Sequence, residues 1–378
     1  GAISPAVGAV VSGQPVVVTP SAPTMYKLTV TDAGGDVIES LLFVDVAAPA
    51  GTLHEARTDF AAARLQDGRV FVSGGSNGSA LDATELVDPA RNWSTKGPAL
   101  FAPRAKHVSA VLADGRVLIA GGEIGGAATA TAEIYDPRVA PIGQVSMTGV
   151  LSTARASAAA VVMNDGRVLV IGGRAAGVPV AACEVYDPAT GAFTATGSLI
   201  EARGDATATP LGDGRTLVAG GLGVGGSLAT AEVYDPATGV WTSVGAMASA
   251  RTRHAATRLA DGTVLVSGGA AGVDLSTQEI YDPATGAWTS AADLATARRS
   301  ACSALWVDGK AYVLGGLSGA SAVAAVEIFD PATGLVSVAP SLNAARGRAA
   351  AFAGPFGVLL IGGEDAGLAL GTFEIYLP

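Results

Sequence analysis

The stretch RGDATATPLGDGRTLVAGGLGVGGSLATAEVYDPATGVWT, from Arg203 to Thr242, decides the fold of this 378-residue chain. It begins with an arginine and small apolar residues, turns at Asp213-Gly214, and continues through an apolar run to the doublet Gly220-Gly221. A loop of small residues then leads to AEVYDPATG and the aromatic residue Trp241. Short runs bounded by turn-forming residues indicate β-strands, four of them in this stretch.

Seven copies of this pattern follow one another. Three features recur in every copy and can be used to count them. An arginine opens the copies at Arg57, Arg104, Arg155, Arg203, Arg251, Arg298 and Arg346. A glycine doublet begins at Gly74, Gly121, Gly172, Gly220, Gly268, Gly315 and Gly362. A glutamate opens the third run at Glu85, Glu133, Glu184, Glu232, Glu279, Glu327 and Glu374. Neighbouring arginines are 47 or 48 residues apart, with one interval of 51, and a fixed period of this size predicts a repeat array.

The runs of the third copy show how the strands are expected to lie. Ala156 to Met163 is small and apolar, which suits a crowded innermost strand. Arg167 to Gly173 is rich in β-branched residues and predicts the second strand, and Ala182 to Pro188 predicts the third. Phe193 begins the outer strand. The Asp-Gly pair between the first two runs predicts a tight hairpin turn, because glycine adopts positive φ there.

The Asp-Gly turn, the glycine doublet, the Glu-x-Tyr run and the following aromatic residue resemble kelch repeats from about Arg57 to the C-terminus. This resemblance implies a β-propeller with one four-stranded blade per repeat. It implies no single function, because kelch propellers serve as binding scaffolds and, less often, as enzymes. We therefore expect an all-β, seven-bladed propeller over residues 47–378, with blade repeats that start near residues 57, 104, 155, 203, 251, 298 and 346.

The last copy ends at Phe373 to Pro378, after its third strand, so its outer strand must come from elsewhere. Leucine or methionine stands four residues before each repeat arginine, and Leu53 stands four residues before Arg57 in the same way. We therefore predict that residues 47–53 supply the outer strand of the last blade and pair with Phe373 to Leu377. Closure of this kind protects strand edges that would otherwise stay unpaired.

Residues 1–46 form a different segment, whose alternating pattern predicts β-sandwich strands. Tyr26 to Thr31, Gly34-Gly35 and Leu41 to Val46 resemble the end of a bacterial immunoglobulin-like surface module. The resemblance covers about half of such a module, which runs to ~100 residues. The missing strands lie upstream, come from a partner or do not exist. The chain begins at Gly1 without a visible signal peptide, and we expect a part of a longer secreted bacterial chain.

The amino-acid composition argues against two classes of partner, nucleic acids and membranes. The net charge is −10, with 23 Lys and Arg against 33 Asp and Glu, which argues against nucleic acid or an anionic membrane. No apolar run approaches the ~20 residues that span a bilayer. We predict no nucleic-acid partner and no membrane span in this chain.

The residues that usually carry metal chemistry are few and scattered. His54, His107 and His254 stand in different parts of the repeat array, and Cys183 and Cys302 fall on strands of blades that are not neighbours. Galactose-oxidase-like members of the kelch family hold copper with histidines and tyrosines, one of them cross-linked to a cysteine, and these residues do not map onto that ligand set. We expect no metal, no cofactor, no catalytic residue and no enzymatic activity.

The repeated arginines and glutamates match in number, so we interpret them as structural ion pairs within or between blades. The alternative is a pocket for an anion or an acidic glycan. The variable position two residues after the arginine is the better candidate for a site at the channel mouth. We predict binding residues there and beside it, at Asp59, Lys106, Asp205, Arg253, Arg299 and Arg348. Their mixed charges suit a polar ligand such as a sugar, or a water-filled mouth that neutralises itself.

These features predict a non-catalytic module, secreted or on the bacterial cell surface, that binds a protein or glycan at the arginine-bearing face. One alternative is a structural subunit of an extracellular filament or surface assembly, with self-association through residues 1–53 by strand pairing. A carbohydrate-active or galactose-oxidase-like enzyme is the less favoured third alternative.

Overall fold

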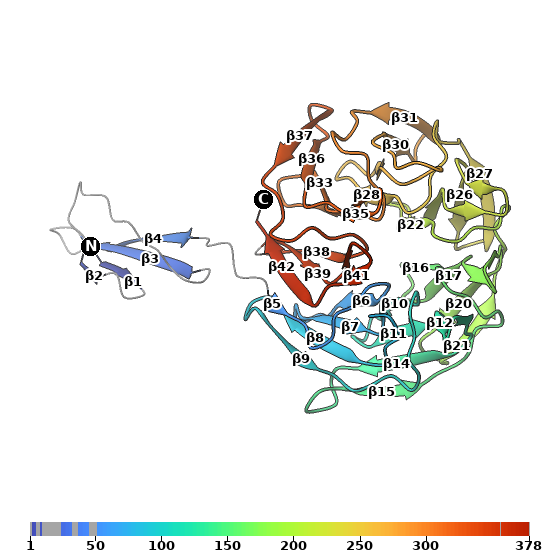
Figure 1. The fold of residues 1–378 in the computed structure, drawn as a ribbon, viewed down its shortest axis with the longest axis horizontal. Coiled ribbons are helices and arrows are strands. Elements are labelled where there is room, and N and C mark those ends of the chain that lie inside the picture. The colour runs from blue at the N-terminus through green and yellow to red at the C-terminus, as the bar shows by residue number, and fades with distance from the viewer. Residues whose placement is uncertain are drawn as a thin grey trace.

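The computed structural model describes residues 2–4, 8–9, 24–31, 37–44, 51–355 and 357–377. This part of the chain contains strands and turns and no helix. No described helix is therefore long and apolar enough to cross a membrane. Seven four-stranded antiparallel sheets lie around a common centre (Figure 1). The predicted all-β, seven-bladed propeller is confirmed.

The first four blades follow the chain in order, from the innermost strand outward. They are β6 (Ala61–Arg64), β7 (Val70–Ser73), β8 (Thr84–Asp88) and β9 (Trp93–Lys96); β10 (Val108–Val111), β11 (Val117–Ala120), β14 (Ala132–Asp136) and β15 (Gln144–Met147); β16 (Ala159–Val162), β17 (Val168–Ile171), β20 (Cys183–Asp187) and β21 (Ala192–Ala195); and β22 (Thr207–Pro210), β23 (Thr216–Ala219), β26 (Ala231–Asp235) and β27 (Val240–Val244).

The last three blades repeat this order. They are β28 (Ala255–Arg258), β29 (Val264–Ser267), β30 (Gln278–Asp282) and β31 (Ala287–Ala291); β32 (Cys302–Leu305), β33 (Ala311–Leu314), β36 (Val326–Asp330) and β37 (Leu335–Ala339); and β38 (Ala350–Gly354), β39 (Gly357–Ile361), β42 (Thr372–Tyr376) and β5 (Gly51–Thr52). Five loops between second and third strands carry two-residue hairpins: β12 (Glu123–Ile124) with β13 (Ala127–Ala128), β18 (Arg174–Ala175) with β19 (Val178–Pro179), β24 (Leu222–Gly223) with β25 (Gly226–Ser227), β34 (Leu317–Ser318) with β35 (Ser321–Ala322), and β40 (Glu364–Asp365) with β41 (Leu368–Ala369).

The hydrophobic core lies between neighbouring blades. The second strand of each blade is fully buried, in agreement with its β-branched, apolar composition. Tyr135 of the second blade stacks on Phe71 of the first, with ring centroids 3.9 Å apart. Aromatic pairs of this kind add to the stabilisation from buried area. The repeat tyrosines therefore serve packing between and within blades.

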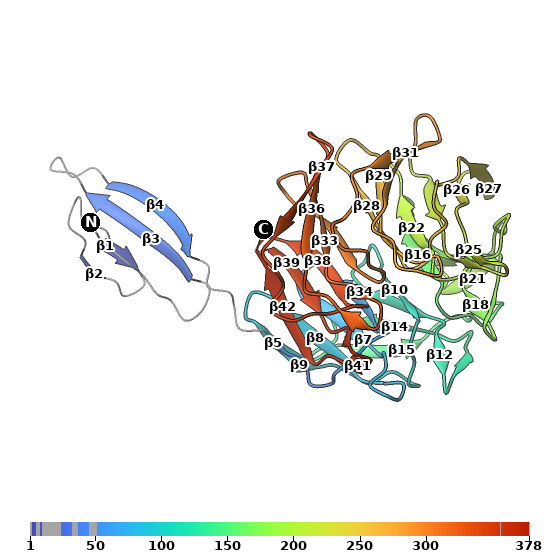
Figure 2. The ribbon, with the colours of Figure 1, turned by 45° about the horizontal axis from the view of Figure 1, so that its top comes forward.

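The ring is closed by a strand from the N-terminal side of the propeller. Gly51 and Thr52 of β5 pair with Phe373 and Thr372 of β42, so the seventh blade receives its outer strand (Figure 2). The described strand has two residues and pairs at the start of β42, whereas we expected residues 47–53 opposite 373–377. Residues 47–50 lie outside the described part.

The N-terminal segment forms a single antiparallel sheet in its described residues, in the order β2 (Gly8–Ala9), β1 (Ala2–Ser4), β3 (Thr24–Thr31) and β4 (Val37–Val44). β3 and β4 pair along their whole length, from Thr24 opposite Val44 to Thr31 opposite Val37. One sheet does not establish a sandwich, so the partial immunoglobulin-like module stays a prediction. Self-association through residues 1–53 also stays a prediction, since much of that segment lies outside the described residues.

Candidate functional site at the propeller mouth

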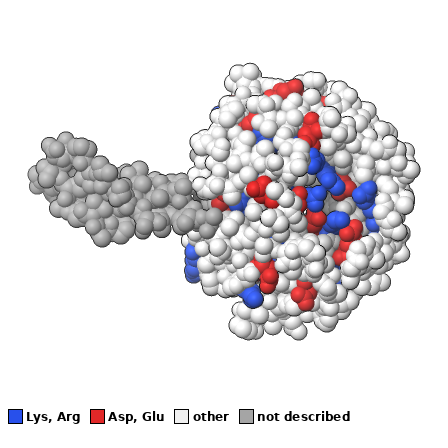
Figure 3. Space-filling model, viewed as in Figure 1, with Lys and Arg blue, Asp and Glu red and all other residues white. Residues whose placement is uncertain are grey.

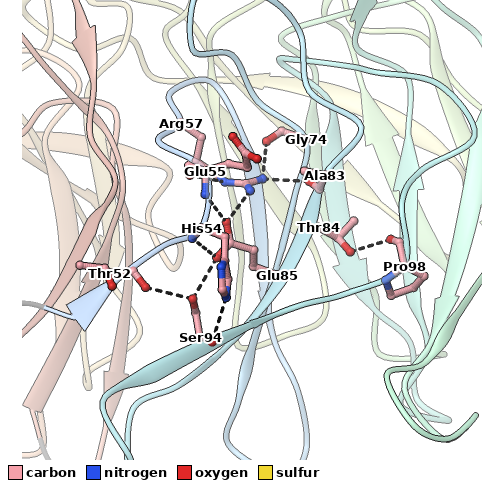
Figure 4. A network of polar contacts seen from close by, with 10 residues as sticks. All are labelled: Thr52, His54, Glu55, Arg57, Gly74, Ala83, Thr84, Glu85, Ser94 and Pro98. Atoms are coloured by element: carbon pink, nitrogen blue, oxygen red, sulfur yellow. Dashed lines mark hydrogen bonds and ion pairs between the residues drawn. The ribbon is translucent and has the colours of Figure 1, made fainter.

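The repeat arginines are buried, and the first blade shows how each is held (Figure 4). Arg57 donates to the carbonyl oxygens of Gly74 (2.7 Å) and Ala83 (2.9 Å) and forms a 2.7 Å ion pair with Glu85. The second Glu85 oxygen accepts the backbone N–H of His54 at 2.8 Å. Burial lowers the pKa of the Arg57 guanidinium, and the Glu85 charge opposes that shift.

The same arrangement recurs in all seven blades. Each arginine pairs with the glutamate of its own repeat, and each donates to the carbonyl of the first glycine of the doublet. Each arginine side chain is at most 1% exposed and each glutamate at most 4%. The guanidinium groups are occupied and out of reach of solvent, so this layer offers no open anion pocket.

The variable position two residues later forms a ring around the channel mouth. Its seven members adopt left-handed backbone conformations, with φ between 50° and 54°: Asp59, Lys106, Ser157, Asp205, Arg253, Ser300 and Arg348. Residues other than glycine rarely adopt this conformation, and they cluster at functional sites where they occur. We call these seven residues the mouth ring.

Backbone hydrogen bonds join the mouth ring from blade to blade. The N–H of each member donates to the carbonyl of the member before it at six junctions, from Lys106 to Asp59 (2.8 Å) through Arg348 to Ser300 (3.0 Å). Among the described residues no such bond joins Asp59 to Arg348, where the ring closes. Their side chains meet instead, at 3.2 Å. The ring is therefore fixed by the fold, while its side chains are free to vary.

Charged side chains of the mouth are paired unequally. Lys106 contacts Glu123 at 3.0 Å, and Arg348 contacts both Asp59 (3.2 Å) and Glu364 (3.3 Å). Asp205 has only a 3.7 Å ion pair with Arg174. In the described part of the chain, the exposed Arg253 guanidinium has neither a hydrogen-bond nor an ion-pair partner. The mouth thus holds one unpaired cation beside one weakly paired carboxylate.

The structure brings five of the six predicted binding residues into one hollow of about 140 Å³, which Asp59, Lys106, Asp205, Arg253 and Arg348 line together with Ser157 and Ser300. The sixth, Arg299, lines an adjoining hollow of about 680 Å³ that also contains Asp205 and Arg253. Lys, Arg, Asp and Glu gather around the centre of this face (Figure 3).

Three charged residues of the site were not among the predicted ones, namely Glu123, Arg174 and Asp274. Glu123 and Arg174 line the mouth, and Asp274 pairs with Arg299 at 2.5 Å. All three lie in loops between the second and third strands. Glu123 and Arg174 directly follow a glycine doublet, and Asp274 lies further along such a loop, so their signal in the sequence is a position on the same face as the repeat arginines.

Two histidines lie beneath the mouth in a packed environment. Nε2 of His107 meets the Ser73 hydroxyl at 2.9 Å, and Nε2 of His254 meets the Thr207 hydroxyl at 2.7 Å. Burial lowers the pKa of both rings to about 3, and nearby arginines add to the shift. Phe60 occupies the corresponding position in the first blade, which shows that the site accepts a purely apolar ring.

Comparison with known proteins identifies the repeats. The Kelch motif family model matches residues 155–199, 207–248 and 298–343. A fungal alcohol oxidase of the AA5 family, solved in complex with copper, superposes with a TM-score of 0.73 at 19% identity over 88% of this chain and 76% of the oxidase. A structure of YjhT superposes with a TM-score of 0.59 at 17% identity over 76% of this chain and 99% of YjhT. No curated protein sequence matches the chain.

The oxidase corrects our functional prediction. We expected a non-catalytic binding module or a structural subunit and no enzymatic activity. A propeller of the same fold is an oxidase, so the fold gives no ground for excluding catalysis, and the non-catalytic prediction is contradicted. At this identity the likeness shows the fold and not the reaction.

Copper does not fit the residues present. Among the described residues, no group of three or more His, Cys, Asp or Glu side chains is placed to hold a metal ion. The Nε2 atoms of His107 and His254 are engaged with hydroxyl groups in separate blades. Burial raises the pKa of the Cys183 thiol to about 11 and that of Cys302 to about 12, so both stay protonated.

Three observations indicate the same repeat unit. The arginine, glycine doublet and glutamate recur in the same order, the structure has seven four-stranded blades, and the Kelch motif matches three of the repeats. The chain is a seven-bladed β-propeller that contains kelch repeats.

Proposed function

We propose that the propeller binds a small hydroxylated carboxylic acid, of the sugar-acid class, at its mouth and acts on it by acid–base chemistry without a metal. The observation that carries this proposal is the unpaired Arg253 guanidinium, held in the mouth ring and exposed to the hollow. A guanidinium presents a planar fork of donors that matches a carboxylate.

Asp205 supplies the second contact. It precedes Arg253 in the mouth ring, since the Arg253 N–H donates to the Asp205 carbonyl at 3.3 Å. Its carboxylate has only the long ion pair with Arg174, so oxygen lone pairs remain for a ligand hydroxyl. A carboxylate in contact with a hydroxyl group can take up its proton as a general base. The pair therefore recognises an acid and a neighbouring hydroxyl together.

The remaining mouth residues favour selectivity over promiscuous anion binding. Lys106 and Arg348 already contact carboxylates, so they add little free positive charge. An anion without a hydroxyl group would leave Asp205 unpaired and close to a second negative charge, which costs binding free energy. The proposal therefore places a glycan-type ligand on the arginine-bearing face. The predicted extracellular location stays a prediction.

Calorimetric titration with galacturonate tests the binding, with galactose as the neutral comparator. We expect galacturonate alone to bind, and Arg253→Met to weaken binding at least tenfold because the carboxylate loses its partner. Arg215→Met is the matched control, since Arg215 pairs with Asp213 at the opposite ends of the strands. Equal binding of galactose, or unchanged binding by Arg253→Met, would contradict the proposal.

The chemistry is tested by following galacturonate by NMR in deuterated water. We expect turnover with the wild type, and its loss in Asp205→Asn while binding persists, because the amide cannot take up the proton. Activity retained in Asp205→Asn would remove Asp205 from the chemistry. If the wild type does not change galacturonate, the proposed acid–base chemistry is wrong and only the proposed binding remains.

A further inference from the structure

Two hollows adjoin the mouth and share lining residues with it. The blade-five hollow, of about 680 Å³, is lined by Leu222, Ala270, Val273, Asp274 and Ala320 and shares Asp205 and Arg253 with the mouth. The blade-one hollow, of about 370 Å³, is lined by Ser76, Ser79 and Ala105 and shares Asp59, Lys106 and Glu123 with the mouth. We call the mouth and these two hollows together the trough.

Both hollows have the same cause in the sequence. The first glycine of the doublet and the repeat glutamate are 11 residues apart in blade one (Gly74 to Glu85) and blade five (Gly268 to Glu279). In the other five blades the separation is 12, as from Gly220 to Glu232. The two shorter loops are the two without a short hairpin; single bridges, Ser76 with Ala80 and Ala270 with Asp274, close them. Each loop that is one residue shorter lines a hollow beside the mouth.

We propose that the ligand is an acidic oligosaccharide that lies across the face, from the blade-one hollow over the mouth to the blade-five hollow. This inference rests on the proposed function and extends it from one sugar acid to a chain of them. A carboxylate of a middle unit pairs with Arg253, and neighbouring units occupy the two flanking hollows.

Volume supports a ligand of several units. The mouth alone has a volume of about 140 Å³, less than half of the ≈300 Å³ at which typical ligand pockets begin. Both flanking hollows are larger, at about 680 Å³ and about 370 Å³, and both lie within the ≈300–1,000 Å³ of typical ligand pockets. A single sugar acid would leave most of the trough empty.

The trough walls are suited to a saccharide more than to an extended peptide. A peptide commonly binds by adding a strand to a free edge. Here the bridges Ser76 with Ala80 and Ala270 with Asp274 occupy backbone groups of the short loops within each loop. Ser76 and Ser79 offer hydroxyl groups at one end, and the pair of Arg299 with Asp274 offers charged groups at the other.

The blade-five wall is held in place before a ligand arrives. Asp274 pairs with Arg299 at 2.5 Å and accepts the Gly319 N–H at 2.6 Å, so it joins the short loop of blade five to the hairpin of blade six. A wall that is already ordered costs less conformational entropy on binding.

Titrations with galacturonate and its dimer, trimer and tetramer test the inference. We expect the affinity to rise at least tenfold from the monomer to the trimer. Inserting one glycine after Gly272 or after Gly78 restores the 12-residue separation and should remove much of this gain, while monomer binding stays. The same insertion after Gly177, in a blade-three loop already of full length, is the matched control. Ala320→Trp fills the blade-five hollow without changing loop length and should act in the same way.

The outcomes separate the two proposals. A trimer that binds no more tightly than the monomer, while Arg253→Met still weakens monomer binding at least tenfold, overturns the oligosaccharide and leaves the sugar-acid site standing. Absence of binding by every member of the series overturns the proposed function itself. Tighter binding of a poly-glutamate peptide than of the trimer overturns the choice of a saccharide.

Discussion

The repeat arginines and the mouth ring are two residues apart in every blade, and they differ in almost every physical respect. The arginines are identical, buried and paired with identical glutamates. The mouth-ring side chains vary in size and charge, reach the hollow and are unequally paired. The fold holds both sets in fixed backbone positions. Uniformity therefore marks the residues that stabilise the propeller, and variation on the same frame marks the residues that meet a ligand.

The largest expected effect comes from breaking one buried pair. Arg203→Met leaves the Glu232 carboxylate buried without its partner, and the carbonyls of Gly220 and Thr230 also lose a donor. We expect the free energy of unfolding to fall by about 3–5 kcal/mol, measured by urea denaturation.

Two controls sharpen that result. Arg215→Met breaks an exposed pair and should cost at most ~1 kcal/mol. Arg253→Met removes a group without a partner and should change stability by less than ~0.5 kcal/mol. If Arg253→Met lowered the free energy of unfolding as much as Arg203→Met, the mouth ring would be as important for stability as the repeat arginines, which would contradict the comparison.

A smaller effect concerns acid stability. The folded chain keeps His107 and His254 neutral, with pKa values near 3, whereas an unfolded histidine takes up a proton below about pH 6.5. The unfolded state therefore binds more protons in this range, and stability falls as the pH drops from about 6.5 toward 3. Alanine occupies this repeat position in four blades, so His254→Ala is the natural variant.

We expect His254→Ala to reduce the loss of stability between pH 7 and pH 5, compared by urea denaturation at both values. Phe60→Ala, at the same repeat position in the first blade and without an ionisable ring, is the control and should keep the wild-type dependence. An unchanged slope in His254→Ala would show that other groups govern acid unfolding.

The smallest effect lies where the mouth ring closes. Asp59→Asn removes the ion pair with Arg348 at the one junction that lacks a mouth-ring backbone bond. Both side chains are partly exposed, at 22% and 28%, so the loss should stay below ~1 kcal/mol in urea denaturation. Ser300→Ala, at a junction with its backbone bond, is the reference. A loss of several kcal/mol would mean that this pair is needed to hold the ring closed.

The propeller could be predicted because its marks depend on local chemistry that recurs. The Gly220-Gly221 doublet needs positive φ values of 57° and 100°, and a Cβ at Gly220 would lie 2.4 Å from the Arg251 carbonyl oxygen. No other residue type suits that position, so the doublet recurs in every copy. The mouth position could also be predicted, since it stands at a fixed distance from the arginine.

The trough and the pairing within it could not be predicted in the same way. Which cations keep a partner depends on side chains from neighbouring blades, as with Arg174 and Asp205. The one-residue difference between loops is visible in the sequence, but its effect on the surface depends on the hairpins beside it. The exclusion of catalysis was wrong because it depended on the ligand set of one known enzyme.

The left-handed backbone of the mouth ring restricts which residues can ever occupy it. Side chains branched at Cβ are genuine outliers at such φ values, and Asp, Lys, Ser and Arg are the types present here. A combinatorial library for retargeting this face therefore has seven variable positions and a reduced set of residue types without Val, Ile or Thr. Within that set the ligand preference of the propeller can change while the blades below remain the same.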